Sequence, residues 1–386
     1  MSAIKNSLIY IFIFTIVIIL SAINDSNLQK KDWKKGTHFF SAAAIIIIPA
    51  IMAGLRNPVV GTDTQVYAVP LFDLAVGSST LENVVVAMPR IEVGFTALAF
   101  GISRITNDYR VFLFAIAFII QLFVYLSIYK TRETHSVLIA EVIYLFFFFN
   151  ASLSMMRQMI AASIILFGTT YLKENKYLHF FFWLFIAYQF HNSALLGLAF
   201  IPIHFMFSRY SIVGSAKKIG MKIWKYRFWV VLMLFFAVLI RIIIVDAVTY
   251  LVNQGILKTL YLAYVHPNSR FSTSTELFIL YPLVYLALFM KKDKNYEGIA
   301  ICIIDLLFYY MQGINFYMYR LGTYYMAFRI LSLSEETINY YRLIKYKKIK
   351  KNKGLRVIYI LFISFICWFF FYAVNNQYQT MPYYFR

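Results

Sequence analysis

Polar and charged side chains in this chain are concentrated in a few short motifs that separate long apolar stretches. The motifs are GLRNPVVGTDTQVY at 54–67, RIE at 90–92, RQ at 157–158, HNS at 191–193 and YRLGTYY at 319–325. Arginine recurs in them, and its planar guanidinium binds phosphate oxygens in a bidentate way that lysine cannot match. Histidine and carboxylate groups, which take part in proton transfer, stand in the same motifs. These residue types predict a site that binds a phosphorylated substrate and moves a proton.

The side chains predicted to bind phosphate and sugar groups are Arg56, Arg157, Gln158, Arg241, Arg320 and Tyr324. Arg157, His191 and Arg320 each stand at the start of an apolar run, so a helix N-terminus is expected at each of them. Helix N-termini present free N–H groups and roughly half a positive charge, which favours a bound anion. The alternative for any single arginine is a side chain that extends from an apolar run to the membrane interface.

The candidates for proton transfer are His191, Asp63 and Glu92. His191 precedes an Asn-Ser pair that is typical of a helix start, and it could accept a proton or donate a hydrogen bond to phosphate. Asp63 and Glu92 could orient a sugar hydroxyl or accept its proton. The alternatives are a histidine with satisfied hydrogen bonds, and salt bridges from the carboxylates to Arg56 or Arg90. The sequence leaves both interpretations open.

The composition indicates which elements position these motifs. Of the 386 residues, 61% are hydrophobic and 14% are charged, whereas about 25% are charged in an average soluble domain. A soluble globule of this length could not bury so much apolar surface. A cytosolic enzyme and a disordered chain are therefore excluded. The composition predicts an all-α polytopic membrane protein, because helices satisfy their own backbone hydrogen bonds in lipid.

Twelve apolar stretches approach the ~20 residues that a membrane-spanning helix requires. They are 7–23, 37–55, 110–129, 136–150, 156–172, 177–190, 192–207, 228–246, 276–290, 297–312, 320–338 and 356–374. The first is expected to be a retained span, because no obvious small-x-small cleavage site follows it. The chain from 1 to 386 is predicted to be one integral membrane domain.

The net charge of +20 supports this topology. Of the 37 basic residues, 25 lie in six loops on one side, ten lie on the other side, and Arg241 and Arg329 lie inside spans. Cytoplasmic loops collect Lys and Arg, so the polar motifs and both termini are predicted to face away from the cytoplasm. The basic loop 339–356 is expected to contact anionic lipids, and nucleic acid is not an expected partner.

One apolar segment, 91–106, does not fit the alternation of spans. If it crossed the membrane, every later basic loop would face outside. It is therefore expected to be a re-entrant or interfacial helix within a long outer loop, 56–109. Irregular backbone at membrane depth is tolerated only where it lines protein or a wet cavity. A second outer loop is expected at 247–275.

Two acidic residues, Glu141 and Asp305, fall inside predicted spans, where a charge is costly. They are expected to form a buried pair or hydrogen bond, and the alternative is a proton relay. Most Tyr and Phe side chains are expected to face lipid or form interface belts. The tyrosines around Arg320 could stack on sugars or pack against a prenyl chain.

The polar motifs occur in an order that resembles the EpsG/Wzy-type oligosaccharide repeat-unit polymerases of bacterial surface polysaccharides. The resemblance covers about residues 50 to 330 and includes GLRNPVVGTDTQVY, RIEVGF at 90–95, LSMMRQMIAASIILFG at 153–168, FHNSALLGLAFIP at 190–202 and YRLGTYY. Asn57-Pro58 departs from the family pattern, in which a Tyr is more usual after the arginine. The sequence shows no nucleotide phosphate-binding loop, zinc motif or cytoplasmic Asp-x-Asp pair, which favours a lipid-linked donor.

The resemblance implies a metal-independent, GT-C-like glycosyltransferase of the bacterial inner membrane, without a cofactor and with its active site facing the periplasm. It implies block transfer of undecaprenyl-pyrophosphate-linked oligosaccharides into O-antigen or capsule, and a chain-length regulator protein is an expected partner. Arginines would hold the pyrophosphate, and His191 or Asp63 would take the proton of the attacking hydroxyl. The alternatives are an O-antigen ligase, a flippase or transporter for lipid-linked oligosaccharides, and an enzyme that adds an acyl group or a single sugar.

Overall fold

The computed structural model describes residues 2–28, 35–211, 249–255, 280–289, 296–311, 316–335 and 351–385. All regular secondary structure in these ranges is helical, apart from two isolated β-bridges. The predicted all-α class is therefore confirmed. The expected span at 228–246, Arg241 within it, and most of the outer loop 247–275 lie outside the described residues.

Four helices in the described part of the chain are long and apolar enough to cross a membrane. They are Asn6–Leu28 within α1 (Ser2–Leu28), α6 (Tyr109–Lys130), Val137–Ser154 and Leu355–Val374. Val137–Ser154 joins α7 (Val137–Tyr144), η2 (Leu145–Phe149) and α8 (Asn150–Ser154), and Leu355–Val374 joins the end of α21 (Lys351–Trp368) to η5 (Phe369–Val374). The chain is thus a helical membrane protein, whereas the number of twelve spans stays a prediction.

The other apolar helices of the described residues, or their apolar parts, are shorter than the usual span of about 20 residues. They are α2 (Lys35–Gly54) with its apolar part His38–Gly54, α9 (Met156–Leu172), α10 (Tyr177–Tyr188), η3 (Asn192–Ala199) with α11 (Phe200–Ser211), α15 (Leu286–Phe289) and α16 (Tyr296–Met311). The expected single span at 320–338 is instead divided into α17 (Phe316–Leu321), α18 (Thr323–Ala327) and α19 (Arg329–Ser334). The first break lies at Gly322, where an added Cβ would come within 2.6 Å of the Phe308 Cβ, so the chain approaches α16 very closely there.

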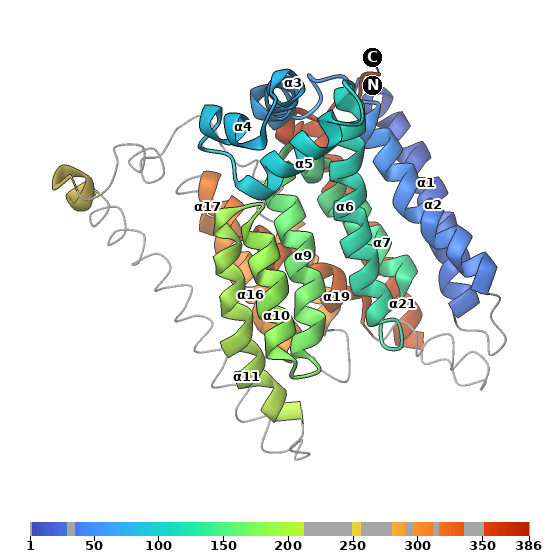
Figure 1. Ribbon diagram of the computed structural model, residues 1–386. Coiled ribbons are helices and arrows are strands. Elements are labelled where there is room, and N and C mark those ends of the chain that lie inside the picture. Colours follow the sequence, from blue (N-terminus) through green and yellow to red (C-terminus); the bar gives the residue numbers. More distant parts are fainter. Residues whose placement is uncertain are drawn as a thin grey trace.

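The two chain ends lie at the same end of the helical bundle (Figure 1), beside α3 (Val69–Gly77), α4 (Leu81–Ala87) and α5 (Val93–Ser103). The basic connections 130–135 and 173–176 lie at the opposite end. This arrangement agrees with the predicted alternation of loops, and which end faces the periplasm stays a prediction. The 11-residue helix α5 is only about 16 Å long, roughly half of the hydrocarbon core of a bilayer, so it does not cross one.

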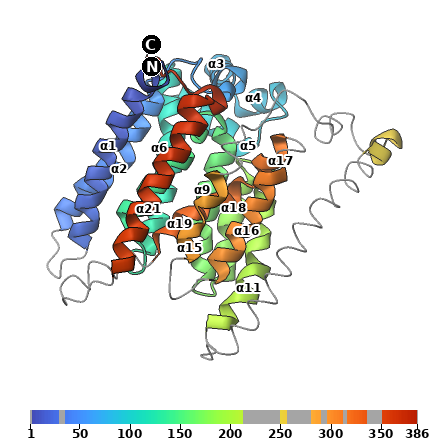
Figure 2. The ribbon, with the colours of Figure 1, turned by 180° about the vertical axis from the view of Figure 1, so that it is seen from behind.

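The segment after α21 closes the end of the bundle that carries the long loop. Figure 2 shows α21 running along the bundle toward this end. Beyond it, the carbonyls of Gln379 and Tyr384 accept hydrogen bonds of 2.9 Å each from the backbone N–H groups of Gly61 and Asn57. Gly61 has a φ of 90°, and a Cβ there would lie 2.4 Å from the Leu153 carbonyl oxygen. Only glycine fits this position, which immediately precedes Thr62 and Asp63.

The predicted intramembrane acids are both partnered. Asp305 forms a 2.5 Å ion pair with Arg329, and both side chains are fully buried. The hydroxyls of Tyr281 and Tyr285 also donate to the Asp305 carboxylate. Glu141 is buried and accepts a 2.7 Å hydrogen bond from the Gln121 amide. These contacts agree with the expected buried pair and hydrogen bond.

Many aromatic side chains lie inside the bundle. Phe14 packs edge-on against Phe149 and Trp368, with ring centroids 5.5 and 5.7 Å apart, and all three are buried. Around Arg320, Tyr319 and Tyr324 are buried as well. The expectation that such rings mostly face lipid was wrong for Phe14 and Phe149, because the interior of the bundle is as apolar as lipid and accepts the same side chains.

Candidate active site

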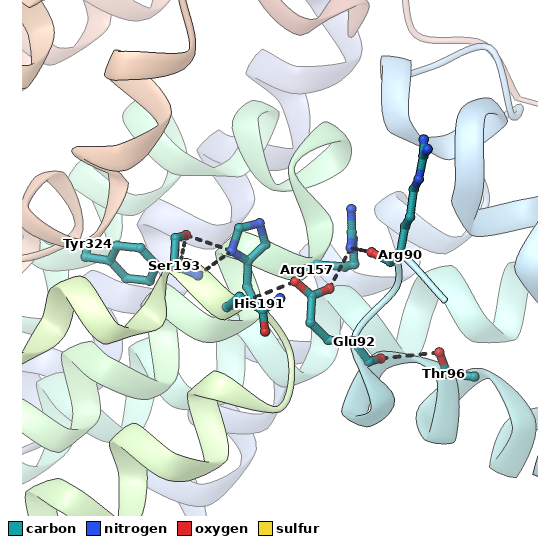
Figure 3. Close-up of polar contacts among 8 residues, drawn as sticks. Arg90, Glu92, Thr96, Arg157, His191, Ser193 and Tyr324 are labelled. Atoms are coloured by element: carbon teal, nitrogen blue, oxygen red, sulfur yellow. Dashed lines mark hydrogen bonds and ion pairs between the residues drawn. The ribbon is translucent and has the colours of Figure 1, made fainter. Parts of the chain in front are cut away.

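Glu92 connects three segments at the end of the bundle that carries the long loop. It precedes α5, and its Oε2 lies 2.5 Å from Nη1 of Arg157 in the first turn of α9. Its Oε1 accepts a 3.1 Å hydrogen bond from the backbone N–H of Asn192 at the start of η3. Figure 3 shows the Glu92 carboxylate directed toward Arg157. Glu92 thus forms a salt bridge, but with Arg157, and not with Arg56 or Arg90 as the alternative predicted.

Gly94 allows this close docking. Its backbone N–H donates a 2.8 Å hydrogen bond to the carbonyl of Gln189, which follows α10. A Cβ at Gly94 would lie 2.6 Å from that carbonyl oxygen, so a larger residue would push α5 away from α10.

Replacing Gly94 with alanine is expected to destabilise the protein by about 1–3 kcal/mol, because the two backbones must separate. Displacement of Glu92 should also slow any reaction that depends on Arg157. Thermal unfolding of the purified variant measures the first effect. Gly101→Ala on the same helix is the matched control, since no heavy atom lies within 4 Å of a Cβ there. Equal melting temperatures for the two variants would contradict this role of Gly94.

Arg157 is held on three sides. Besides Glu92, its Nη1 donates to the Arg90 carbonyl oxygen at 3.3 Å, and its guanidinium lies 4.5 Å from the ring centroid of Tyr67. The Arg157 side chain still has 20% of its surface exposed. Tyr67 lies in the π-helical turn η1 (Thr64–Ala68), a kind of turn that is frequent at functional sites. Tyr67 was not among the predicted site residues, although its position four residues after Asp63 in the same motif was a usable signal.

His191 precedes η3 and caps its N-terminus. Its Nδ1 accepts a 3.3 Å hydrogen bond from the backbone N–H of Ser193 and lies 2.7 Å from the Ser193 hydroxyl. That hydroxyl lies 2.9 Å from the hydroxyl of Tyr324, which is buried in α18 (Figure 3). The sequence placed His191 and Tyr324 among the candidates but missed Ser193, which links them.

Electrostatics connect Asp63 to the same group. Burial raises the pKa of Asp63, and the positive charges of Arg320 and Arg157 oppose this rise. Burial lowers the pKa of His191 to about 4; the negative charge of Glu92 opposes this shift, and Arg157 and Arg320 add to it. His191 is therefore uncharged at neutral pH. We call Asp63, Tyr67, Glu92, Arg157 and His191 the Arg157 cluster.

Two of the predicted binding residues are engaged elsewhere in this structure. Arg56 is 1% exposed, and its guanidinium donates to the backbone carbonyls of Ala53 and Leu153, so it braces the end of α2 instead of joining the cluster. Gln158 is buried and donates a 2.5 Å hydrogen bond to the Arg320 carbonyl oxygen, which ties α9 to α17.

The expected helix N-termini are found at two of three positions. Helix α9 begins at Met156 and η3 begins at Asn192, so N–H groups are present beside Arg157 and His191. Arg320 instead lies in the last turn of α17, and the prediction of a helix start there was wrong. The helix already begins at Phe316 and ends before Gly322, where the close approach to α16 interrupts it.

A pocket of about 620 Å³ adjoins the cluster. Its polar lining comes from Arg90, Glu92, Tyr188, Gln189 and Asn192, and its apolar lining from Val85, Val86, Pro89, Ile91 and Val93. The pocket places open space beside the carboxylate that holds Arg157. An anionic ligand entering from this side could compete with Glu92 for the guanidinium.

Comparison with known protein families covers most of the chain. The model of the EpsG family matches residues 39–385, which include every residue of the Arg157 cluster. Neither the curated proteins nor the solved structures contain a significant match. A relationship to GT-C enzymes thus stays a prediction. Since the family model covers nearly the entire sequence, the chain belongs to the EpsG family.

Proposed function

We propose that this chain polymerises undecaprenyl-pyrophosphate-linked oligosaccharide units into a surface polysaccharide at the periplasmic face of the bacterial inner membrane. Membership of the EpsG family supports a polysaccharide polymerase-type role in a membrane protein. The observation that carries the proposal is the Glu92–Arg157 pair, which is placed at one end of an apolar helical bundle beside an open pocket.

Arg157 is suited to bind the pyrophosphate of a lipid-linked donor. Its side chain is partly exposed, and its one carboxylate partner carries less charge than a pyrophosphate. Glu92 would keep its second hydrogen bond, to the Asn192 N–H, when the guanidinium turns to the ligand. The Tyr67 ring supports the guanidinium plane from one side. Arg320, whose charge acts on both Asp63 and His191, adds to the positive potential.

The chemistry we propose is one substitution at an anomeric carbon. A hydroxyl of the incoming lipid-linked unit attacks the anomeric carbon of the growing chain, and a new glycosidic bond forms. The bond from that carbon to the pyrophosphate oxygen breaks, and undecaprenyl pyrophosphate leaves with both electrons. Arg157 stabilises the developing negative charge. The proton of the hydroxyl passes to a base of the cluster, for which Asp63 and His191 are the candidates.

The test is incubation of the purified protein with lipid-linked repeat units and no nucleotide sugar. We expect a ladder of products that differ by one repeat unit. Addition of lipid A core distinguishes a ligase, which would transfer glycan to the core without elongating it. Movement of labelled lipid-linked units across proteoliposomes without new glycosidic bonds would support a flippase and overturn the proposal.

A further inference from the structure

The Nδ1 atom of His191 receives two hydrogen-bond donors from Ser193. The backbone N–H of Ser193 donates to it at 3.3 Å, and the Ser193 hydroxyl lies 2.7 Å away (Figure 3). A backbone N–H can only donate, so Nδ1 must present a lone pair and cannot itself carry a hydrogen. A neutral imidazole has one N–H group, which is therefore on Nε2.

Tyr324 completes a directional chain of hydrogen bonds. When the Ser193 hydroxyl donates to Nδ1, its lone pairs are available to accept from the Tyr324 hydroxyl, 2.9 Å away. The buried Tyr324 side chain fixes the position of this hydroxyl in α18. Hydrogen bonding at one ring nitrogen determines which nitrogen carries the proton and how the ring is oriented.

The Nε2 atom of His191 has no hydrogen-bond partner within the part of the chain that the structure describes, and it faces away from Ser193 (Figure 3). The charged groups around the ring are Glu92, Arg157 and Arg320. Burial and the two arginines together outweigh Glu92 and keep the pKa of His191 low. The ring therefore presents a neutral N–H donor beside the guanidinium that is proposed to hold the pyrophosphate.

We infer that Ser193 and Tyr324 are positioning residues, and that His191 donates a hydrogen bond through Nε2 to an oxygen of the transferred substrate instead of acting as the base. This inference rests on the proposed function. The nitrogen that Ser193 leaves available, Nε2, already carries a hydrogen, so it has no lone pair with which to take another. The proton of the attacking hydroxyl then passes to the carboxylate of Asp63 as the new glycosidic bond forms and undecaprenyl pyrophosphate leaves.

Substitutions of His191 separate a donor from a base. Glutamine places an amide N–H near the position of Nε2, whereas asparagine places its amide near Nδ1. We expect His191→Gln to retain product formation within about tenfold of the wild type. His191→Asn and His191→Ala should lose about 10²–10³-fold, the usual cost of removing a transition-state donor. Equal loss in all three variants would overturn the donor role.

The pH dependence of kcat/KM gives a second readout. A carboxylate base works only when ionised, so kcat/KM should fall as the pH drops through the pKa of Asp63. Burial raises this pKa, and the positive charges of Arg320 and Arg157 oppose the rise. Tyr67 and Thr62 also contact this carboxylate. We expect the acid limb to persist in His191→Gln and to disappear in Asp63→Asn. Loss of the limb in His191→Gln instead would make His191 the base.

A third measurement is independent of enzymatic activity. The nitrogen chemical shifts of the His191 imidazole, in protein labelled at histidine, distinguish the two neutral tautomers. We expect Nε2–H in the wild type and a weaker preference for it in Ser193→Ala, which loses the hydroxyl donor but keeps the backbone N–H donor, with recovery in Ser193→Thr. Tyr324→Phe should weaken the preference, whereas Tyr325→Phe, whose hydroxyl bonds to the Leu196 carbonyl at 2.8 Å, is the control. An Nδ1–H signal in the wild type would overturn the inference even if polymerisation is observed, and failure of polymerisation alone would leave the tautomer result standing.

Discussion

Replacing Arg157 with alanine is expected to lower the rate of repeat-unit polymerisation by about 10²–10³-fold, the usual effect of removing one group that stabilises transition-state charge. Arg157 is the side chain of the cluster that meets a carboxylate, a carbonyl and an aromatic ring while part of its surface remains exposed. The polymer ladder formed by the purified variant from lipid-linked units measures this effect. Arg157→Lys should lie between alanine and the wild type, since lysine keeps the charge but not the bidentate geometry.

Arg90→Ala is the matched control for this experiment. Arg90 is exposed and adjoins the same site, and Arg157 contacts only its backbone carbonyl oxygen, which alanine retains. Figure 3 shows its side chain pointing away from the Glu92–Arg157 pair. Because the Arg90 side chain lines the pocket but does not contact the Glu92–Arg157 pair, the Arg90 variant should lose far less activity than the Arg157 variant. If Arg157→Ala, present at normal levels, gave full-length polymer at the wild-type rate, Arg157 would not bind the leaving group.

Replacing Arg329 with methionine is expected to destabilise the folded protein by about 3–5 kcal/mol, because it leaves the carboxylate of Asp305 buried without its ion-pair partner. The hydroxyls of Tyr281 and Tyr285, which donate to Asp305, cannot replace a full positive charge. Thermal unfolding in detergent, followed by tryptophan fluorescence, should show a large fall in melting temperature.

A double variant separates loss of the pair from loss of packing. In Arg329→Met with Asp305→Leu, no unpaired charge remains, so much of the lost stability should return. Arg90→Met, which changes an exposed arginine, should melt like the wild type. A single Arg329 variant that unfolds at the wild-type temperature would mean that the interior tolerates the uncompensated charge of Asp305.

The apolar stretches predicted the positions of most described helices but not how they end. The stretch at 136–150 continues through η2 and α8 to Ser154, because the polar Asn150 is buried and bonded to Trp368 and Thr380. A hydrophobicity profile cannot predict this continuation of the helix, because it scores a buried polar residue with hydrogen-bond partners in the same way as a polar residue of a loop. The division of 320–338 at Gly322 depends in the same way on contact with Phe308, far away in the sequence.

The sequence predicted several residues of the candidate site but not which of them contact one another. The sequence selected Glu92, Arg157 and His191, and the structure brings them together. It also selected Arg56, whose guanidinium is engaged by carbonyls of α2 and α8. Arg56 and Arg157 carry the same charge, and each stands in a short polar motif between apolar stretches. What separates them is burial, which follows from how the helices pack and is not encoded in either motif.

The hydrogen bonds that close the end of the bundle also set an order of events during synthesis. The Tyr383 hydroxyl donates to the Met52 carbonyl across 331 residues of sequence, and the Tyr10 hydroxyl donates to the Thr380 carbonyl across 370. At a translation rate of ~5–20 residues per second, the segment around Met52 waits roughly 20–70 s for these partners. Until then the loop that carries Asp63 lacks its backbone contacts, so a nascent chain already inserted in the membrane is held without a finished site. The hydrogen bonds from Asn57 and Gly61 to Tyr384 and Gln379 can therefore form only after residue 384 has been synthesised, well after the first helices.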